Sequence, residues 1–294
     1  MKFAAIDIGS NAVRLLFSQV FEGRKANTFK KDALFRVPLR LGEDVFVNNK
    51  ISKEKTSELV DTMIAFKHLI KAYKPESYMA CATSAMREAE NRDEVVKLIR
   101  KKSGIDLEII DGKKEADIIY SNQIAENLDK KGNYLYIDVG GGSTELTLIS
   151  KTRIVSSQSF NIGTVRFLKK KDLKSEWSKM EKWLKENESQ YSSIEGIGSG
   201  GNINKIFSMS GIKTGKPLQL KTIKKIFNEL SSHTLEERIT KLGLRPDRAD
   251  VIIPAANIFI SVMKWAKIKN LYVPQVGLSD GIIHVLYEKQ KRKN

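Results

Sequence analysis

The fold is decided by Asp7-Ile8-Gly9-Ser10-Asn11 and by Asp138-Val139-Gly140-Gly141-Gly142-Ser143-Thr144-Glu145. Each stretch follows an apolar run that is typical of a β-strand and leads into a second such run. A strand, a carboxylate, a glycine turn and a returning strand make a β-hairpin, and glycine lets the backbone amides at its tip approach an anion closely. Because the arrangement occurs twice, we predict a duplicated fold with phosphate held between the halves.

The hydrophobic pattern around the first turn predicts alternating strands and helices. They are strands at 2–8, 12–21 and 25–37, a helix capped by Ser52, a strand at 78–83, a helix ending near Gly104, a strand at 107–110 and a helix at 113–128.

The second half begins in the same way. We predict strands at 133–139, 144–150 and 153–161, a helix at 175–186, a strand at 194–197 and a helix after Gly198-Ser199-Gly200-Gly201-Asn202. A further helix is opened by the capping pattern of Thr234 and Glu237, and another at 247–266 tolerates Pro254 through a kink or a break. A strand at 271–273 and a helix at 280–287 complete the prediction.

The repeat extends beyond the turns. Leu39-Arg40-Leu41-Gly42 follows the third strand of one half, and Asn161-Ile162-Gly163-Thr164-Val165-Arg166 follows that of the other. We therefore predict an α/β fold of two similar domains, residues 1–128 and 129–294, with a cleft between them. Each domain is expected to have a mixed five-stranded sheet flanked by helices. The boundary is placed near 129–133, where a polar stretch breaks the pattern.

The composition describes a globular protein, since 41% of the 294 residues are hydrophobic and 29% are charged. No apolar run approaches the roughly 20 residues that span a bilayer. A strand that starts directly after Met1 leaves no room for a secretory signal, and the single cysteine, Cys81, excludes an internal disulfide framework. We expect a cytoplasmic protein with no membrane partner.

The net charge of +16 has two explanations, a Lys-rich surface or a polyanionic ligand. The ligand could be nucleic acid, polyphosphate or a phosphorylated nucleotide. The densest basic clusters, Lys169-Lys170-Lys171 and the tail from Lys289 to Lys293, lack the interleaved aromatic residues that stack bases. Nucleic acid is therefore the least favoured partner.

Motifs from almost the whole chain carry a resemblance to a known family. They are Asp7-Ile-Gly-Ser-Asn-Ala-Val-Arg14, Ala82-Thr-Ser-Ala-Met-Arg87, Asp111-Gly-Lys-Lys-Glu-Ala116, Asp138-Val-Gly-Gly-Gly-Ser-Thr-Glu145, Asn161-Ile-Gly-Thr-Val-Arg166, Arg248-Ala-Asp-Val-Ile252 and Gly277-Leu-Ser-Asp-Gly281. In this combination the chain resembles the exopolyphosphatase and guanosine pentaphosphate phosphatase family, in the superfamily of actin, sugar kinases and chaperone ATPases. The resemblance implies two actin-like ATPase domains with a ribonuclease H-like fold.

Hydrolysis of a phosphoanhydride needs positioned phosphate, neutralised charge and an oriented water. The expected phosphate ligands at the two turns are Gly9, Ser10 and Asn11, and Gly140, Gly141, Gly142, Ser143 and Thr144. The other reading is a pair of tight hairpins that need glycine only for their backbone. The flanking Asp and hydroxyl residues, which a turn does not need, favour phosphate.

Arg87 is a further candidate, because a guanidinium can grip a phosphate in bidentate fashion. Thr83 and Ser84, just before it, add hydroxyl donors. The alternative for Arg87 is a surface ion pair with Glu88 or Glu90.

Asp138 and Glu145 stand at opposite ends of the second turn, as two hard oxygen ligands suited to Mg²⁺, with Mn²⁺ as an alternative. The resemblance also implies a metal role for these positions. Asp7 is a third candidate, either as a ligand or by orienting the metal's water. The alternative for Glu145 is a polar residue on the exposed face of its strand.

The resemblance implies a glutamate that polarises the attacking water, and Glu115 occupies that position in the helix after Gly112. We expect it to point into the cleft. The preceding residue, often acidic in the family, is Lys114, which would lower the pKa of Glu115 or contact phosphate. The alternative for Glu115 is a helix-stabilising acid at an N-terminus.

Two positions depart from the family pattern. Residues 198–202 open a helix of the kind that accepts an anion, and related ATPases and kinases hold nucleotide there, but Asn202 stands where the family often has Thr. Ser279 stands where it frequently has Arg. His68, His233 and His284 have no metal-ligand spacing.

The leading interpretation is a Mg²⁺-dependent hydrolase that releases terminal phosphate from inorganic polyphosphate or guanosine pentaphosphate. The alternatives are an ATP-dependent kinase or chaperone-like ATPase of the same superfamily, and a non-catalytic sensor of polyphosphate or nucleotide. Longer family members append a C-terminal helical domain, so a shorter polyphosphate or a nucleotide is the more easily accommodated substrate. The sequence leaves open whether the chain forms a homodimer.

Overall fold

The computed structural model describes residues 1–23, 27–120, 129, 131–169, 172–191 and 193–292. Its contacts divide the chain into two compact units. Unit 1 comprises Met1–Asn122 together with Gly277–Asn294, and unit 2 comprises Gln123–Val276. This division differs from the predicted domains of 1–128 and 129–294 at the C-terminal end, since the last segment belongs with unit 1.

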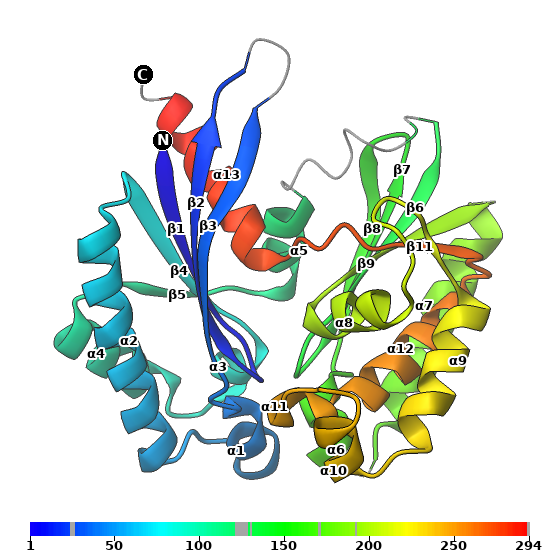
Figure 1. Cartoon of the computed structure of the whole chain (residues 1–294), viewed down its shortest axis with the longest axis horizontal. Helices are drawn as coiled ribbons and strands as arrows, with labels where there is room; N and C mark the ends of the chain where they lie inside the picture. Colours follow the sequence, from blue (N-terminus) through cyan, green and yellow to red (C-terminus); the bar gives the residue numbers. More distant parts are fainter. Residues whose placement is uncertain (24–26, 121–128, 130, 170–171, 192, 293–294) are drawn as a thin grey trace. The chain divides into compact units, whose positions relative to one another are not determined.

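Unit 1 is built on a five-stranded mixed sheet in the order β3-β2-β1-β4-β5 (Figure 1). The first three strands are antiparallel neighbours, and β4 and β5 continue the sheet in parallel with β1. The strands are β1 Lys2–Ile8, β2 Val13–Phe21, β3 Thr28–Val37, β4 Ser77–Ala82 and β5 Leu107–Ile109, and the helices are α1 Leu41–Asn48, α2 Lys53–Tyr73, α3 Ser84–Glu88, α4 Arg92–Ser103, α5 Gly112–Tyr120 and α13 Leu278–Lys291.

The helix predicted after Ser52 is confirmed as α2. The Ser52 side chain accepts a hydrogen bond from the Lys55 amide, as an N-cap should. Leu59, Met63 and Phe66 are buried one turn apart on one face, so this helix is held to the unit by an apolar stripe.

The last helix, α13, packs against β1 although the rest of the chain separates them in sequence. The Phe3 and Tyr287 rings meet edge to face at 6.4 Å, and the Tyr287 hydroxyl donates to Glu22. A Cβ at Gly281 would overlap the Ile118 carbonyl, so glycine lets α13 and α5 touch backbone to backbone. These contacts place α13 in unit 1.

Unit 2 is built on a mixed sheet in the order β10-β11-β9-β6-β7-β8 (Figure 1). The prediction of five strands is wrong here, because the two-residue strand β10 pairs antiparallel with β11 and is too short to leave a sequence pattern. The strands are β6 Asn133–Val139, β7 Thr144–Ser150, β8 Arg153–Phe160, β9 Ile194–Ser199, β10 Leu218–Gln219 and β11 Asn270–Tyr272, and the helices are α6 Thr164–Lys169, α7 Lys174–Gln190, α8 Gly201–Met209, α9 Leu220–Ser231, α10 Leu235–Thr240, α11 Pro246–Ala249 and α12 Ile252–Trp265.

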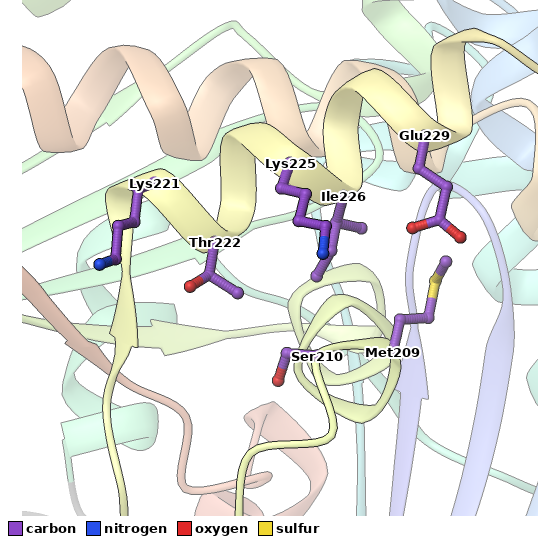
Figure 2. A pocket seen from close by; sticks show the side chains of 7 residues that line it. All are labelled: Met209, Ser210, Lys221, Thr222, Lys225, Ile226 and Glu229. Atoms are coloured by element: carbon purple, nitrogen blue, oxygen red, sulfur yellow. The ribbon is translucent and has the colours of Figure 1, made fainter.

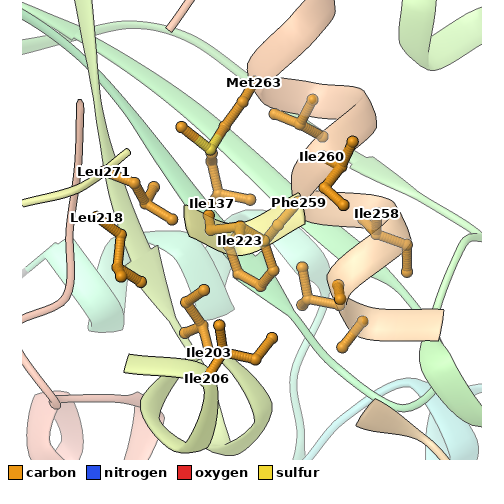
Figure 3. Close-up of a cluster of buried hydrophobic side chains, with 14 of the residues drawn as sticks. Ile137, Ile203, Ile206, Leu218, Ile223, Ile258, Phe259, Ile260, Met263 and Leu271 are labelled. Atoms are coloured by element: carbon orange, nitrogen blue, oxygen red, sulfur yellow. The ribbon is translucent and has the colours of Figure 1, made fainter. Parts of the chain in front are cut away.

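The core of unit 2 gathers around α12 (Figure 3). Phe259 and Met263 of this helix are fully buried with Ile203 of α8 and Ile223 of α9. The predicted helix at 247–266 is broken into α11 and α12, as the prediction allowed, and Pro254 lies in the first turn of α12, where an amide has no intrahelical acceptor. None of the helices described in either unit is long and apolar enough to cross a membrane.

Four described helices were not predicted: α1, α3, α6 and α9. The first three have eight residues or fewer, so the helical period is barely expressed. The predicted continuation of α5 through 121–128 and the cluster residues Lys170 and Lys171 lie outside the described residues.

Candidate active site

The first glycine turn closes the β1–β2 hairpin of unit 1. The Gly9 amide donates to the Ala12 carbonyl at 3.1 Å, while the Ser10 carbonyl accepts from the Gly42 amide at 2.9 Å and the Asn11 carbonyl from the Arg40 amide at 3.1 Å. Within the part of the chain that the structure describes, the Ser10 amide has no acceptor. Of the predicted phosphate ligands, Gly9 therefore uses its amide to shape the turn, and Ser10 has an amide to offer.

Two hydroxyls lie beside this turn. The Ser10 and Ser84 oxygens are 2.8 Å apart and both side chains are buried. Ser84 begins α3 at the end of β4, and the Thr83 amide donates to the Ile8 carbonyl. The structure thus brings Ser10 together with the predicted hydroxyl donors Thr83 and Ser84.

Asp7 and Arg14 are direct cross-strand neighbours in the β1–β2 hairpin. Arg14 Nη1 lies 2.7 Å from Asp7 Oδ2 in an ion pair, and the Asp7 carboxylate is buried. Among the described residues Oδ1 of Asp7 makes no hydrogen bond. Arg14 therefore holds one oxygen of this predicted metal ligand.

Arg87 and Glu115 are brought together in unit 1. Arg87 Nη1 donates to the Ile110 carbonyl at 2.9 Å and lies 3.9 Å from Glu115 Oε2. Glu115 is buried in the first turn of α5, where its amide donates to the Asp111 carbonyl. Of the two alternative partners of Arg87, Glu90 pairs with Lys50 at 3.4 Å.

Lys114 does not lie beside the Glu115 carboxylate, contrary to the expectation that it would lower the pKa of that group. Its ammonium pairs with Glu108 of β5 on the exposed side of α5, and the hydrogen bond to Glu108 raises the pKa of Lys114. The helix period explains this, because successive residues point about 100° apart. The cation beside Glu115 is Arg87 instead.

The second glycine turn, in unit 2, is tied back by the segment that follows β8. The Gly140 carbonyl accepts from the Thr164 amide at 3.0 Å, the Gly141 carbonyl from the Val165 amide at 2.8 Å, and the Gly142 carbonyl from Arg166 Nε at 2.6 Å. All three carbonyls of the turn therefore face one segment of the chain.

The amides of the turn consequently face the other way. In a trans peptide the carbonyl of one residue and the amide of the next point in opposite directions. Tying the carbonyls of residues 140–142 thus turns the amides of Gly141, Gly142 and Ser143 to the opposite side, and in the described chain these three amides have no acceptor. We call these three groups the amide nest; consecutive amides of this kind form an anion site.

Glu145 and Asp138 flank the amide nest as direct cross-strand partners on β7 and β6. Glu145 Oε1 accepts from the Ser143 hydroxyl at 2.6 Å and from the Ser159 hydroxyl at 2.9 Å. Glu145 is only 3% exposed, which excludes the alternative of an exposed strand residue. Two carboxylates thus stand next to the anion-accepting amides.

The part of the chain that the structure describes contains no group of three or more His, Cys, Asp or Glu side chains placed to hold a metal. Mg²⁺ at phosphate sites commonly uses one or two carboxylates and completes its shell with water and phosphate oxygens. The Asp138–Glu145 pair beside the amide nest fits such a cation.

The glycine loop before α8 reaches the same edge of the unit 2 sheet. A Cβ at Gly200 would lie 3.1 Å from the Val139 carbonyl and 3.3 Å from Asp138 Oδ1, and Gly200 has a positive φ of 106°. Ser199, the cross-strand neighbour of Asp138, is fully buried. The loop at 198–202, for which the sequence left nucleotide binding open, therefore packs on Asp138, while Ser279 is buried in unit 1.

A hollow of about 380 Å³ lies elsewhere in unit 2, between the end of α8 and the face of α9 (Figure 2). Its lining contains none of the predicted site residues, and Ser210 there already donates to the Phe207 carbonyl. The lining residues are Met209, Ser210, Lys221, Thr222, Lys225, Ile226 and Glu229.

Two residues near the second turn were missed as functional candidates. The motif that contains Arg166 gives this residue no role, and no sequence pattern indicates Ser159. The register of β7 and β8, which pairs Glu145 with Ser159, would have indicated the second. Nothing local in the sequence indicated that the Arg166 side chain reaches Gly142.

The sequence pattern of the Ppx/GppA phosphatase family matches residues 34–290. The chain belongs to the Ppx/GppA phosphatase family. This confirms the family predicted from the sequence and, with it, the class of enzyme, a hydrolase of phosphate compounds.

Solved structures agree with this assignment. An Aquifex aeolicus member of the Ppx/GppA family is 26% identical, with a TM-score of 0.77 over 99% of this chain and 98% of that one. An exopolyphosphatase from Cytophaga hutchinsonii is 22% identical and shares the fold, with a TM-score of 0.85 over 98% of both chains. The family fold therefore covers both units.

Curated relatives show a similar level of sequence identity. Exopolyphosphatase 1 of Mycobacterium tuberculosis is 24% identical over 96% of this chain and 87% of its own length. A bifunctional 3-dehydroquinate synthase/phosphatase of Fusobacterium nucleatum is 28% identical over 89% of this chain, which spans 43% of that longer protein.

Proposed function

We propose that this protein hydrolyses phosphoanhydride bonds and releases the terminal phosphate of inorganic polyphosphate. The observation that carries the proposal is the amide nest, whose three amides are turned outward because the carbonyls before them are tied back. A chain of phosphates is an acceptor-rich anion, which such amides bind without a charged side chain. The similarity to exopolyphosphatases supports polyphosphate as the substrate.

Asp138 and Glu145 are the residues that would hold Mg²⁺ in this proposal, with Mn²⁺ as an alternative. The cation would neutralise phosphate charge as the bond breaks. Ser143 and Ser159 orient the Glu145 carboxylate through their hydroxyls. Asp7 of unit 1 is the further metal candidate from the sequence, and its ion pair with Arg14 leaves one carboxylate oxygen for a cation or its water.

Glu115 is the proposed general base. Its carboxylate is buried and lies 3.9 Å from the Arg87 guanidinium, so a positive charge stands beside it. An ionised carboxylate can accept the proton of a water as that water attacks phosphorus. Arg87 and the buried Ser10–Ser84 hydroxyl pair are the proposed phosphate contacts of unit 1.

A substrate panel tests the activity. Phosphate release is measured from polyphosphates of several lengths, from guanosine pentaphosphate and from ATP, with Mg²⁺, with Mn²⁺ and with a chelator. We expect turnover of polyphosphate that the chelator abolishes. Turnover of ATP alone would establish the kinase or ATPase alternative, and tight binding of polyphosphate without turnover would establish a sensor. Guanosine pentaphosphate in the same panel decides whether it is a second substrate.

Glu115→Gln tests the base. We expect kcat for phosphate release to fall by about 10²- to 10⁴-fold, because a positioned base contributes that much. Asp117→Asn, an exposed carboxylate in the same helix, is the matched control and should leave kcat unchanged. If Glu115→Gln kept full activity, Glu115 would not be the base.

A further inference from the structure

The segment between β8 and α6 does more than connect two elements. The Ile162 carbonyl of this segment accepts a hydrogen bond from the Thr144 hydroxyl. The Thr164 and Val165 amides of the segment donate to the second glycine turn. A Cβ at Gly163 would overlap the backbone of Gly141 and Gly142, so only glycine allows this approach. We call residues 161–166 the clamp.

Arg166 is the charged member of the clamp. It is 2% exposed, and its Nε donates to the Gly142 carbonyl at 2.6 Å. Burying a guanidinium is costly unless it is well bonded, so a plain amide would hold a turn at lower cost. The position of this charge, directly behind the amide nest, is what calls for an explanation.

In unit 1 the carbonyls of the first glycine turn are also held by donors from a later segment, but among the described residues no buried charged side chain is one of these donors. There the Gly42 and Arg40 amides hold the Ser10 and Asn11 carbonyls. The Arg40 side chain pairs with Glu43 at 3.0 Å. Backbone donors therefore suffice to shape a turn of this kind, and Arg166 is an addition specific to the turn with three glycines.

We infer that Arg166 is a positioning residue for the phosphate-binding turn, acting through the Gly142 carbonyl to hold the amide nest toward the anion. This inference rests on the proposed function for the identity of the anion, a phosphate chain. The bond to Arg166 fixes the peptide plane between Gly142 and Ser143, and the trans peptide then fixes the Ser143 amide. A cation bonded to that carbonyl also polarises the peptide and strengthens its amide as a donor.

The clamp is itself anchored from α7. Glu176 Oε2 accepts from the Asn161 amide at 3.1 Å, and Lys179 holds the other oxygen at 2.7 Å. The anchor bonds the backbone of the clamp, so we expect a substitution at Arg166 to loosen one peptide of the turn while the backbone ties remain.

Arg166→Lys tests the inference, with Arg238→Lys as its matched control. Arg238 of α10 also bonds backbone carbonyls in unit 2, those of Leu230 and Ala249, but is not part of the clamp. Each variant is titrated with inorganic tripolyphosphate while the amide signals of the second glycine turn are followed by NMR. KM and kcat for polyphosphate and the thermal unfolding of each variant are measured in parallel.

We expect Arg166→Lys to weaken tripolyphosphate binding and raise KM roughly tenfold or more, since a bond to a charged group is lost. Its unbound Gly142 and Ser143 amide signals should shift, and Arg238→Lys should bind as the wild type does. Equal binding by Arg166→Lys and the wild type, or an equal loss in both variants, would overturn the inference.

Three further outcomes are decisive. If Arg166→Lys does not fold, Arg166→Gln, which keeps a donor but removes the charge behind the Gly142 carbonyl, should weaken binding in the same direction, and unchanged binding would overturn the inference. If the wild type binds tripolyphosphate but hydrolyses no polyphosphate, the proposed function fails while the role of Arg166 is still decided by binding. Absence of binding by the wild type would overturn both.

Discussion

At the scale of single residues, the environment of a side chain decides its chemistry more than its type does. Cys81 illustrates this, because burial in β4, with Glu108 and Asp7 nearby, raises the pKa of its thiol to about 12. Such a thiol is a packing residue and no nucleophile. Glu115 and Lys114 are neighbours in the chain, yet one is buried beside Arg87 and the other is exposed and pairs with Glu108.

Ser159→Ala tests the support of Glu145. The change removes one of two hydroxyls that orient the carboxylate, so we expect the Mg²⁺ concentration for half-maximal phosphate release to rise roughly tenfold. Ser157→Ala is the matched control on the same strand, since its hydroxyl bonds Thr147 instead. An equal response of the two variants would show that Glu145 does not depend on Ser159.

At the scale of elements, the short helices α1 and α6 hold the two glycine turns. Each begins directly after the third strand of its sheet, and the chain at its start supplies amides to the carbonyls of a glycine turn. A helix start is suited to this, because its first amides have no acceptors within the helix. The repeat seen in the sequence thus has a physical meaning, which is to orient the peptides of each turn.

The capping box of α10 was predicted from Thr234 and Glu237 and is confirmed, with both reciprocal hydrogen bonds in place. We expect Thr234→Ala to lower the free energy of unfolding by about 1 kcal/mol, as loss of an N-cap does. Denaturant unfolding measures this. Thr240→Ala, in the last turn of the same helix, is the control, and a loss as large there would show that the cap is not the cause.

At the scale of the whole molecule, the chain returns at its end to the unit in which it began. In unit 1 the α13 residue His284 stacks on Phe29 of β3 with ring centroids 3.6 Å apart, and Asp280 pairs with Lys31. Burial lowers the pKa of His284 to about 4, and Glu288 acts weakly in the opposite direction. The stacking of α13 on β3 therefore involves an imidazole that is neutral at neutral pH.

This predicts a pH dependence of stability. The unfolded chain binds a proton at His284 below about pH 6.5, whereas the folded chain binds it only near pH 4, so the free energy of unfolding should fall as pH decreases across that window. Denaturant midpoints at pH 7.5 and pH 5 measure the fall. His284→Phe should reduce it, and His68→Gln, at an exposed position, should not. A fall of the same size in His284→Phe would contradict the prediction.

The sequence by itself determined the family, the two glycine hairpins and most of the strands and long helices, because those properties depend on local pattern and backbone chemistry. It also selected Glu115, Arg87, Asp138 and Glu145 as candidates. The tertiary structure decided which other residues these side chains contact. β10 pairs with β11 and α13 packs against β1 although each pair lies far apart in the chain, and Arg166 reaches Gly142 across 24 positions. Contacts of that range follow from how the elements pack, since no local propensity encodes them.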